Sequence, residues 1–210
     1  GARNDIFVDG IRDFASYTRD TFNVEQVEVV KGPASAQTGR GSTGGYINMF
    51  SKQPKLGTLV SGTVGLGIPD YNRATADLNV GGDSLGLGGG TAFRLNLLYH
   101  DTDTPGRDYV ESKRWGIAPS IAVGLGTSTR AILSYYRLEG DSQPDYGIPF
   151  VPAANTALPP QYDDRAAAVD YDNYYGLTKG DYEDTVANLA TFALEHDVTD
   201  GIRIANTTRY

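Results

Sequence analysis

Residues 27–54 read VEVVKGPASAQTGRGSTGGYINMFSKQP, and this stretch decides the fold. A β-rich run ends at the Gly-Pro break of residues 32–33. A glycine-rich link follows, and a second apolar run leads to Pro54. Gly and Pro are the strongest local breaks in regular structure, so the pattern predicts two short strands joined by a glycine-rich link.

The link contains Gly39-Arg40-Gly41-Ser42-Thr43-Gly44, which matches the G-x-G-x-x-G of dinucleotide-binding folds. That fingerprint should start at a strand end, open a helix and be followed by an acid about 20 residues later. Here the first glycine lies well past Val30, Pro54 comes too soon for a full helix, and no acid lies near Val64. We therefore interpret these glycines as positions of positive φ and close backbone approach.

Composition excludes several classes of protein. The 210 residues include no cysteine, which excludes disulfides and thiolate metal sites, and they carry a net charge of −8, which argues against nucleic acid as a partner. Glycine and tyrosine are abundant, with 26 and 14 residues. No apolar run approaches the roughly 18 residues of a membrane helix, whereas a membrane-spanning barrel strand needs only about 9–11 residues of alternating character.

Alternation of apolar and polar residues begins after Pro54. In residues 93–99, for example, Phe93, Leu95 and Leu97 alternate with Arg94 and Asn96. This period of two predicts strands, and similar runs are found near 60–68, 73–80, 115–125, 129–140, 185–198 and 202–210. The second face is small or polar, as a wet or plugged barrel lumen requires, although a soluble sandwich also has one apolar face.

Residues 27–54 resemble the end of the plug domain of TonB-dependent outer-membrane receptors, and the nearest resemblance is to the ferric-siderophore receptor type. Residues 5–14 resemble the plug segment that carries a substrate-facing loop. Short motifs within 94–96, 114–120, 133–135, 147–149 and 206–210 follow in the order of that family's first barrel strands. Gln37-Thr38 departs from the family, which more often has an apolar pair there.

The resemblance implies a mainly β fold, in which part of a plug domain is followed by the first antiparallel strands of a transmembrane β-barrel. Residues 1–55 would be the C-terminal part of the plug. Residues 56–210 would be the N-terminal part of the barrel, with about seven strands. We expect the chain to be a fragment, with the signal peptide and the short box that contacts TonB before Gly1.

The function implied is an outer-membrane receptor and transporter for ferric siderophores, energised through the TonB system. Iron would arrive as the ferric-siderophore ligand, so no resident cofactor, metal site or enzyme activity is expected. The partners would be the siderophore, TonB and outer-membrane lipid, and the location the bacterial outer membrane. Two alternatives stay open: a related receptor for cobalamin, a saccharide or another scarce nutrient, and a non-transport barrel acting as an adhesin or passive pore.

The candidate substrate contacts in the plug are Arg12, Phe14, Tyr17 and Arg19. Guanidinium groups offer fork-shaped donors to anionic oxygens and stack on aromatic planes, which suits an anionic, aromatic ferric catecholate. The resemblance places this part of the plug facing outward toward the bound chelate. The alternative is that Arg12 and Arg19 form surface pairs with Asp13 and Asp20.

A long acidic loop from Asp141 to Asp184 supplies the second group of candidates, which are Tyr146, Tyr162, Tyr171, Tyr174 and Tyr175. Loops of this length are uncommon unless they are functional or disordered. The acids would repel an anionic complex, so the tyrosines could serve gating more than capture. The stretch Asp170-Tyr171-Asp172-Asn173 suggests calcium but lacks the Gly and Glu of an EF-hand.

Lys31 and Arg40 are candidates for a different role. The resemblance implies basic plug residues that face acids on the inner barrel wall, most of them beyond Tyr210, and surface exposure is the alternative. His100 and His196 are isolated histidines without a metal-ligand spacing, and no catalytic motif accompanies them.

Overall fold

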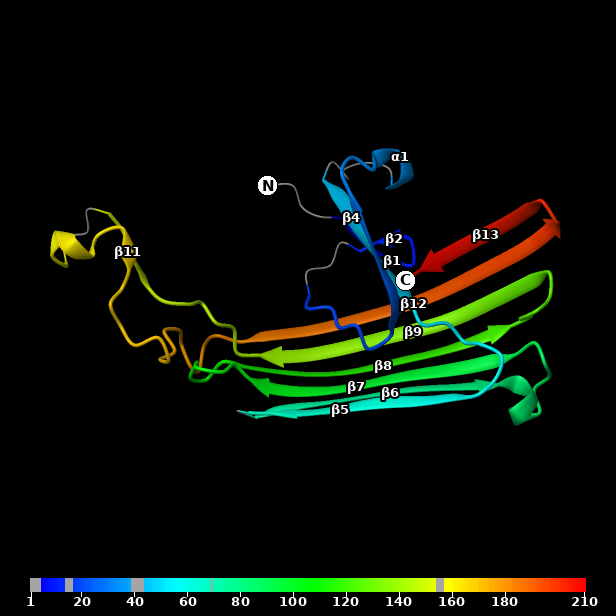
Figure 1. Cartoon of the computed structure of the whole chain (residues 1–210), viewed down its shortest axis with the longest axis horizontal. Coiled ribbons are helices and arrows are strands. Elements are labelled where there is room, and N and C mark those ends of the chain that lie inside the picture. Colours follow the sequence, from blue (N-terminus) through cyan, green and yellow to red (C-terminus); the bar gives the residue numbers. More distant parts are fainter. Residues whose placement is uncertain (1–4, 14–16, 39–43, 69, 154–156) are drawn as a thin grey trace.

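The computed structural model describes residues 5–13, 17–38, 44–68, 70–153 and 157–210. These residues form a four-stranded sheet, called here the small sheet, a seven-stranded sheet, called the large sheet, and a separate two-stranded pair. Figure 1 shows the small sheet rising from one face of the large sheet, while the long loop extends beyond one end of the strands. None of the helices in the described part of the chain is long and apolar enough to cross a membrane.

The small sheet has the strand order β2-β1-β4-β3. Its strands are β1 (Asp5–Val8), β2 (Ile11–Arg12), β3 (Val24–Lys31) and β4 (Gly45–Ser51). Strand β4 pairs parallel with β1 and antiparallel with β3, and the short helix α1 (Ser35–Thr38) lies in the link between β3 and β4. The two strands predicted from residues 27–54 are therefore present, at the centre and one edge of this sheet.

Glycine has a specific structural role at Gly45. Its φ is 112°, and an added Cβ would lie 2.0 Å from the carbonyl oxygen of Val30 on the paired strand. Positive φ and close backbone approach were expected for Gly39, Gly41 and Gly44, and both features are found at the next residue, Gly45. The expectation is wrong at Gly44, which has neither feature, and Gly39 and Gly41 lie outside the described residues.

The large sheet is an antiparallel meander in which each strand pairs with its neighbour in the chain. Its strands are β5 (Leu59–Gly67), β6 (Tyr71–Gly81), β7 (Ala92–Asp103), β8 (Glu111–Val123), β9 (Thr129–Ser142), β12 (Glu183–Thr199) and β13 (Ile202–Arg209). The 3₁₀ helix η1 (Gly82–Leu85) follows β6. The long loop after β9 contains β10 (Phe150–Val151), η2 (Pro160–Tyr162) and β11 (Arg165–Ala166).

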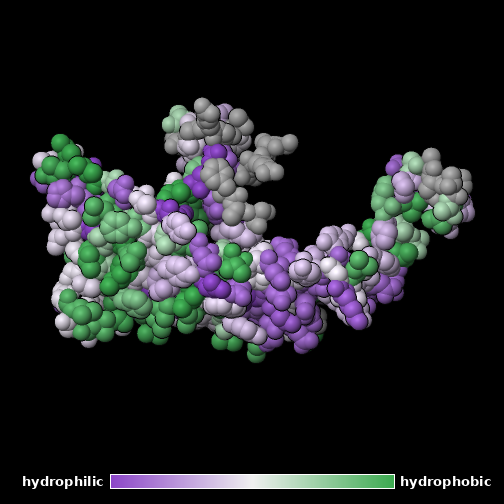
Figure 2. Space-filling view, turned by 180° about the vertical axis from the view of Figure 1, so that it is seen from behind, coloured by the Kyte–Doolittle hydropathy of each residue, from purple (hydrophilic) through white to green (hydrophobic). Residues whose placement is uncertain are grey.

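The two faces of the large sheet differ as the alternation predicts. On β7, Arg94, Asn96 and His100 are buried on the face toward the small sheet, whereas Phe93 and Tyr99 are exposed on the other face. Figure 2 shows hydrophobic side chains spread over the strands and hydrophilic ones gathered where the sheet passes into the long loop. The mainly β fold is confirmed, while the domain boundary at residues 55–56 stays a prediction.

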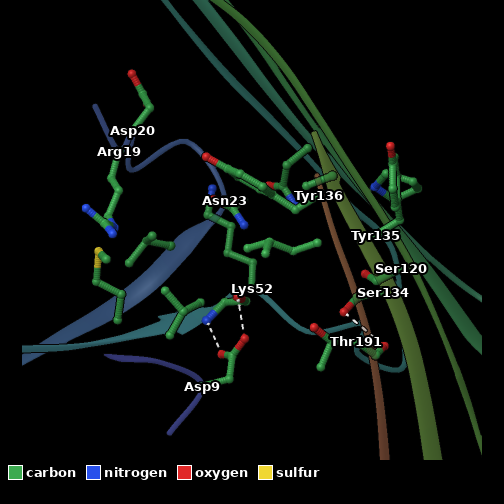
Figure 3. A pocket seen from close by; sticks show the side chains of 18 of the residues that line it. Asp9, Arg19, Asp20, Asn23, Lys52, Ser120, Ser134, Tyr135, Tyr136 and Thr191 are labelled. Atoms are coloured by element: carbon green, nitrogen blue, oxygen red, sulfur yellow. Dashed lines mark hydrogen bonds between the residues drawn. The ribbon is translucent and has the colours of Figure 1, made fainter. Parts of the chain in front are cut away.

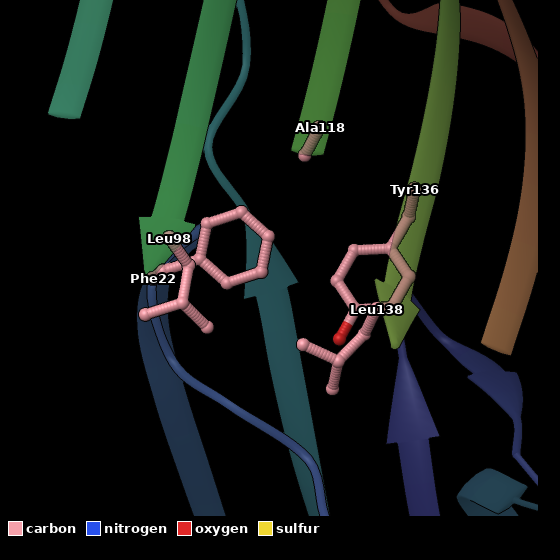
Figure 4. Close-up of a cluster of buried hydrophobic side chains, with 5 residues drawn as sticks. All are labelled: Phe22, Leu98, Ala118, Tyr136 and Leu138. Atoms are coloured by element: carbon pink, nitrogen blue, oxygen red, sulfur yellow. The ribbon is translucent and has the colours of Figure 1, made fainter. Parts of the chain in front are cut away.

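A hydrophobic cluster joins the two sheets. Phe22, just before β3, packs against Leu98, Ala118, Tyr136 and Leu138 of the large sheet (Figure 4). The rings of Phe22 and Tyr136 stack with centroids 5.8 Å apart. Burying a phenylalanine is worth about 1.5–3 kcal/mol, so this cluster holds the N-terminal layer, meaning the described residues of 5–55, against the large sheet.

Candidate functional site

The candidate contacts of the N-terminal layer are held by acids of that same layer. Arg12 forms an ion pair of 3.1 Å with Asp5, and its guanidinium carbon lies 5.4 Å from the centre of the Phe7 ring. Strand β2 positions Arg12 and β1 positions Asp5, which lie on neighbouring strands of the small sheet. The Arg12 side chain as a whole is about one-quarter exposed, at 23%.

Tyr17 and Arg19 share a single carboxylate. The hydroxyl of Tyr17 and the Nε of Arg19 donate to Asp13, at 3.1 and 3.0 Å. The Arg19 guanidinium lies 4.5 Å from the centre of the Tyr17 ring, a cation–π geometry. Burial, reinforced by the charge of Asp13, raises the pKa of Tyr17 to about 12, so this hydroxyl stays protonated at neutral pH.

The structure thus brings Tyr17 and Arg19 together and places Arg12 on a separate acid. The alternative of ion pairs is right in kind but not in partner: Arg12 pairs with Asp5 rather than with Asp13, and Arg19 pairs with Asp13 rather than with Asp20. Phe14 lies outside the described residues. Contact of these residues with a substrate stays a prediction.

Asp20 is the first ionic connection between the two layers. Both terminal nitrogens of Arg73 on β6 donate to its carboxylate, at 2.9 and 2.7 Å, and the Phe22 backbone N–H donates at 3.0 Å. Arg114 on β8 lies 3.9 Å away. Burial alone would raise the pKa of Asp20, but the hydrogen bonds and charge of these donors outweigh it and lower the pKa.

Arg94 on β7 is the centre of a second network. It is 4% exposed and donates twice to Asp77 on the neighbouring strand, at 2.9 and 2.8 Å. Its remaining nitrogen reaches the Gln53 carbonyl at 2.8 Å and Glu25 at 3.3 Å. Lys52 forms an ion pair of 3.1 Å with Asp77. A hydrogen bond from Lys55, with the charges of Lys55 and Arg94, lowers the pKa of Glu25.

Arg209 on β13 makes the third connection. Its guanidinium donates to Thr191 on β12 at 2.9 Å, to the Val8 carbonyl at 2.9 Å and to the Asp9 carboxylate at 3.1 Å. Asp9 also accepts the backbone N–H and hydroxyl of Ser51, at 2.7 and 2.8 Å. The arginine therefore fixes the turn between β1 and β2, where Asp9 has a φ of 52°.

A cavity of about 50 Å³ lies between the layers at these connections. Figure 3 shows Asp9, Arg19 and Asp20 on one side of it, and Ser120, Ser134, Tyr136 and Thr191 of the large sheet on the other. Tyr17 and Arg19 line this cavity, so the layer that carries the candidate substrate contacts also makes the interface with the large sheet.

The polarity of the interface differs from the expectation for Lys31 and Arg40. The acids Asp20, Glu25 and Asp9 of the N-terminal layer meet the arginines Arg73, Arg94 and Arg209 of the large sheet. Lys52 with Asp77 has the expected polarity. Lys31 is exposed and forms no ion pair with any residue in the described ranges, and Arg40 lies outside them. Partners for both beyond Tyr210 stay a prediction.

Sequence reasoning missed Asp9, Glu25 and Arg209, and it considered Asp20 only as a surface partner of an arginine in the same segment. The available signal was the set of arginines on the small or polar face of the strands, at Arg73 and Arg94. A charge on a face that is otherwise small and buried needs a partner, because an unpaired buried charge is costly. The strand pattern could therefore have pointed to acids in the N-terminal layer, without saying which.

The candidate tyrosines of the long loop fall into two groups. Tyr174 accepts a hydrogen bond from the Gln143 side chain at 2.7 Å and donates to Asp181 at 3.2 Å, and Tyr175 donates to the Asp170 carbonyl at 2.6 Å. Desolvation, together with Asp181, raises the pKa of Tyr174. The rings of Tyr146, Tyr162 and Tyr171 are exposed. Of the five candidates, two are thus anchored and three face solvent.

Metal-binding geometry is not found in the described part of the chain: no three His, Asp or Glu side chains there are placed to hold an ion. His100 lies on β7 and His196 on β12, in separate surroundings. Asp170 accepts the Asp172 backbone N–H at 3.1 Å, a local turn contact.

Comparison with known proteins gives consistent results. A family model described as the TonB-dependent receptor plug domain matches residues 1–46. The chain is 43% identical over 215 aligned residues to the catecholate siderophore receptor Fiu of Escherichia coli O157:H7, covering 99% of this chain and 27% of that protein. It is 42% identical to the probable TonB-dependent siderophore receptor PiuA of Acinetobacter baumannii, over 100% of this chain and 27% of that protein.

Among solved structures, the open form of the ferric-catecholate import receptor Fiu from E. coli K12 matches with a TM-score of 0.87 and 41% identity. The match covers 98% of this chain and 31% of that one. The chain therefore spans about a quarter of the length of the curated relatives it matches, 27% in each case above. It corresponds to the region from the plug to the early strands.

Proposed function

Because this chain belongs to the TonB-dependent receptors, as part of a plug and the first strands of a barrel, we propose that the complete protein takes up ferric siderophores across the bacterial outer membrane. The N-terminal layer is the plug part, and the large sheet is the wall part. The substrate class is that of ferric catecholates. The observation that carries the proposal is the 43% identity to a catecholate siderophore receptor across 99% of this chain.

The interface chemistry supports this function. Three arginines of the wall each bind an acid of the plug, so the plug sits on the wall through contacts that can be exchanged for other hydrogen bonds. A hydrophobic contact supplements them at Phe22. A plug held in this way can shift when it is pulled, which the TonB protein does from the periplasmic side.

The cargo passes without chemical change. The ferric chelate binds at the outer face, between the plug segment of Arg12 to Arg19 and the loop tyrosines. Its iron is cargo rather than a resident cofactor, and no catalytic step is involved. The exposed face of the large sheet, with Phe93, Tyr99 and Trp115, contacts outer-membrane lipid.

The two alternatives differ in what the plug must do. A receptor for cobalamin or a saccharide would have the same plug, and only the ligand distinguishes it. A passive pore has no use for a plug that is fixed by ion pairs, because such a plug obstructs the lumen, and an adhesin would show no energy-dependent uptake of a ligand.

The test is uptake of radiolabelled iron by cells carrying the full-length gene, with and without a proton-motive-force uncoupler. We expect saturable uptake of ferric catecholates that stops with the uncoupler while surface binding persists. Substitution of Tyr17 and Arg19 by Ala should weaken binding, whereas Arg203→Ala, at the far turn of β12 and β13, should not. Absence of binding for catecholate, hydroxamate and carboxylate complexes alike would overturn the proposal.

A further inference from the structure

The short loop between β7 and β8 fastens the long loop at its base. The Nε and one terminal nitrogen of Arg107 donate to the two carboxylate oxygens of Asp145, at 2.9 and 2.7 Å. Its other terminal nitrogen donates to the Tyr171 carbonyl. All three contacts come from one guanidinium, whose fork geometry matches a carboxylate. Its side chain is 12% exposed, although it belongs to a loop at the rim of the sheet.

Neighbouring contacts reinforce the connection. The Asp108 backbone N–H donates to the Asp172 carbonyl at 2.7 Å, and the rings of Tyr109 and Tyr174 meet edge to face at 6.5 Å. The Gln143 N–H donates to the Glu111 carbonyl at 3.0 Å. The short loop therefore contacts the long loop both where the latter leaves β9 and where it returns toward β12.

The short loop is itself ordered by internal bonds. The Thr104 N–H donates to the Val110 carbonyl at 2.8 Å, and the Arg107 N–H donates to the Thr104 carbonyl at 3.1 Å. These bonds close the loop and place the Arg107 side chain on the long loop. The backbone that carries Arg107 is therefore held in place by hydrogen bonds within the short loop.

The consequence is topological. Asp145 and Tyr171 stand at the two ends of the segment 146–170, and one side chain binds both. Fixing the two ends of a loop removes much of its conformational freedom. In Figure 1 the segment that carries β11 leaves the sheet from this base. Tyr146 follows one fixed end, and Tyr171, Tyr174 and Tyr175 lie at the other.

The charge of Arg107 also favours its contact with the long loop. The long loop is strongly acidic, and Asp145 would add to its repulsion of an anionic chelate. The hydrogen bonds from Arg107, and then that from the Gly147 N–H, lower the pKa of Asp145, so its carboxylate stays ionised. The charge of Arg107 compensates it at the base of the loop.

We propose that Arg107 is a positioning residue for capture of the ferric chelate, because it holds both ends of the long loop and thereby groups Tyr146, Tyr171 and Tyr174 at the mouth of the receptor. This inference rests on the proposed function for the ligand class. The guanidinium is engaged by the loop, so Arg107 acts through the tyrosines and not by touching the chelate.

The test uses the full-length receptor in outer membranes. The variants are Arg107→Gln, Arg107→Lys, Asp145→Asn and the charge-exchanged pair Arg107→Asp with Asp145→Arg. Lys113→Gln is the matched control, since it removes a cation from an exposed ion pair with Glu111 at the start of β8. The first readout is the Kd for a ferric dihydroxybenzoate complex, together with the half-saturation and maximal rate of uptake. The second is the rate of trypsin cleavage after Arg165 and Lys179 on intact cells, without ligand.

We expect Arg107→Gln to raise the Kd about tenfold, since a charged fork contact is lost, and to leave the maximal rate unchanged. Cleavage in the long loop should accelerate in the same variant. The charge-exchanged pair should recover most of both effects, and Arg107→Lys only part, because a lysine is a point charge without a fork. Lys113→Gln should change neither readout.

Faster cleavage with an unchanged Kd would overturn the positioning role, since the loop would be freed without effect on capture. Unchanged cleavage would also overturn it, because Arg107 would then not hold the loop. A wild-type receptor that binds no ferric chelate would overturn the proposed function and the capture role with it. In that case the cleavage rates would still show whether Arg107 fastens the loop. Failure of the proposed function can therefore be distinguished from failure of the contact between Arg107 and the loop.

Discussion

Asp20 and Arg73, which belong to the plug part and the wall part of the chain, are joined by two hydrogen bonds of 2.9 and 2.7 Å. The Asp20 side chain is 5% exposed and the Arg73 side chain 23%. Removal of one partner of such a pair leaves the other charge buried without compensation. The pair lies beside Phe22, whose backbone N–H also donates to Asp20. The ion pair and the hydrophobic cluster therefore stabilise the same contact between the plug part and the wall part.

Asp20→Asn should weaken this contact by about 3 kcal/mol, because Arg73 loses its counter-charge while remaining largely enclosed. The measurement is hydrogen exchange of the backbone amides around residues 20–24 in the full-length receptor, which reports local opening. Arg203→Gln, which removes the charge of a side chain that is 60% exposed, is the control and should change exchange little. Equal protection in Asp20→Asn and the wild type would contradict the prediction.

The stability of the contact between Asp20 and Arg73 should depend on pH only under acidic conditions. The pKa of Asp20 is lowered from its ordinary value of 3.8, so its contribution to stability is fully present above that value. The contribution is lost as pH falls through the lowered pKa, when the unfolded carboxyl is already protonated. Amide protection near residue 22 should therefore be flat from pH 5 to 8 and fall on acidification below about 4, the ordinary range of aspartate. In Asp20→Asn this particular fall should disappear.

Gly116 on β8 leaves room for the ring of Phe22. An added Cβ would lie 2.8 Å from two carbon atoms of that ring. Gly116→Val should displace Phe22 and destabilise the plug contact by about 1–3 kcal/mol, as overpacking does. Urea-induced release of the plug, followed by its protease sensitivity, would measure the loss. Phe22→Leu combined with Gly116→Val should recover part of it, and a double variant no better than the single one would argue against a steric cause.

Two adjacent glycines provide a matched comparison. Gly45→Ala should destabilise the small sheet by more than 1 kcal/mol, because its φ of 112° is strained for alanine and its Cβ would collide with the Val30 carbonyl. Gly44→Ala should be close to neutral, since nothing lies within 4 Å of the added atom. The yield of folded receptor in the outer membrane and the urea midpoint would distinguish them. Equal effects at the two positions would show that the geometry at Gly45 is not limiting.

Local patterns in the sequence were sufficient to predict the strands. In β7 the alternation of Phe93, Leu95 and Leu97 with Arg94 and Asn96 determines which side chains face the N-terminal layer, because successive residues of a strand point to opposite faces. The two strands around the glycine-rich link also followed from neighbouring residues. Such features depend on backbone geometry within a few positions, which the sequence alone displays.

The ionic contacts depended on the tertiary structure. Asp20 and Arg73 are separated by 53 positions, Glu25 and Arg94 by 69, and Asp9 and Arg209 by 200. No local rule pairs such residues, and the resemblance to known receptors suggested the opposite polarity, with bases on the plug. By itself the sequence determined the strand pattern, the small inner face and the family. Only the packing of the plug part on the wall part decided which acid meets which arginine, because a buried charge takes whichever partner the placement of two separate sheets brings within hydrogen-bonding distance.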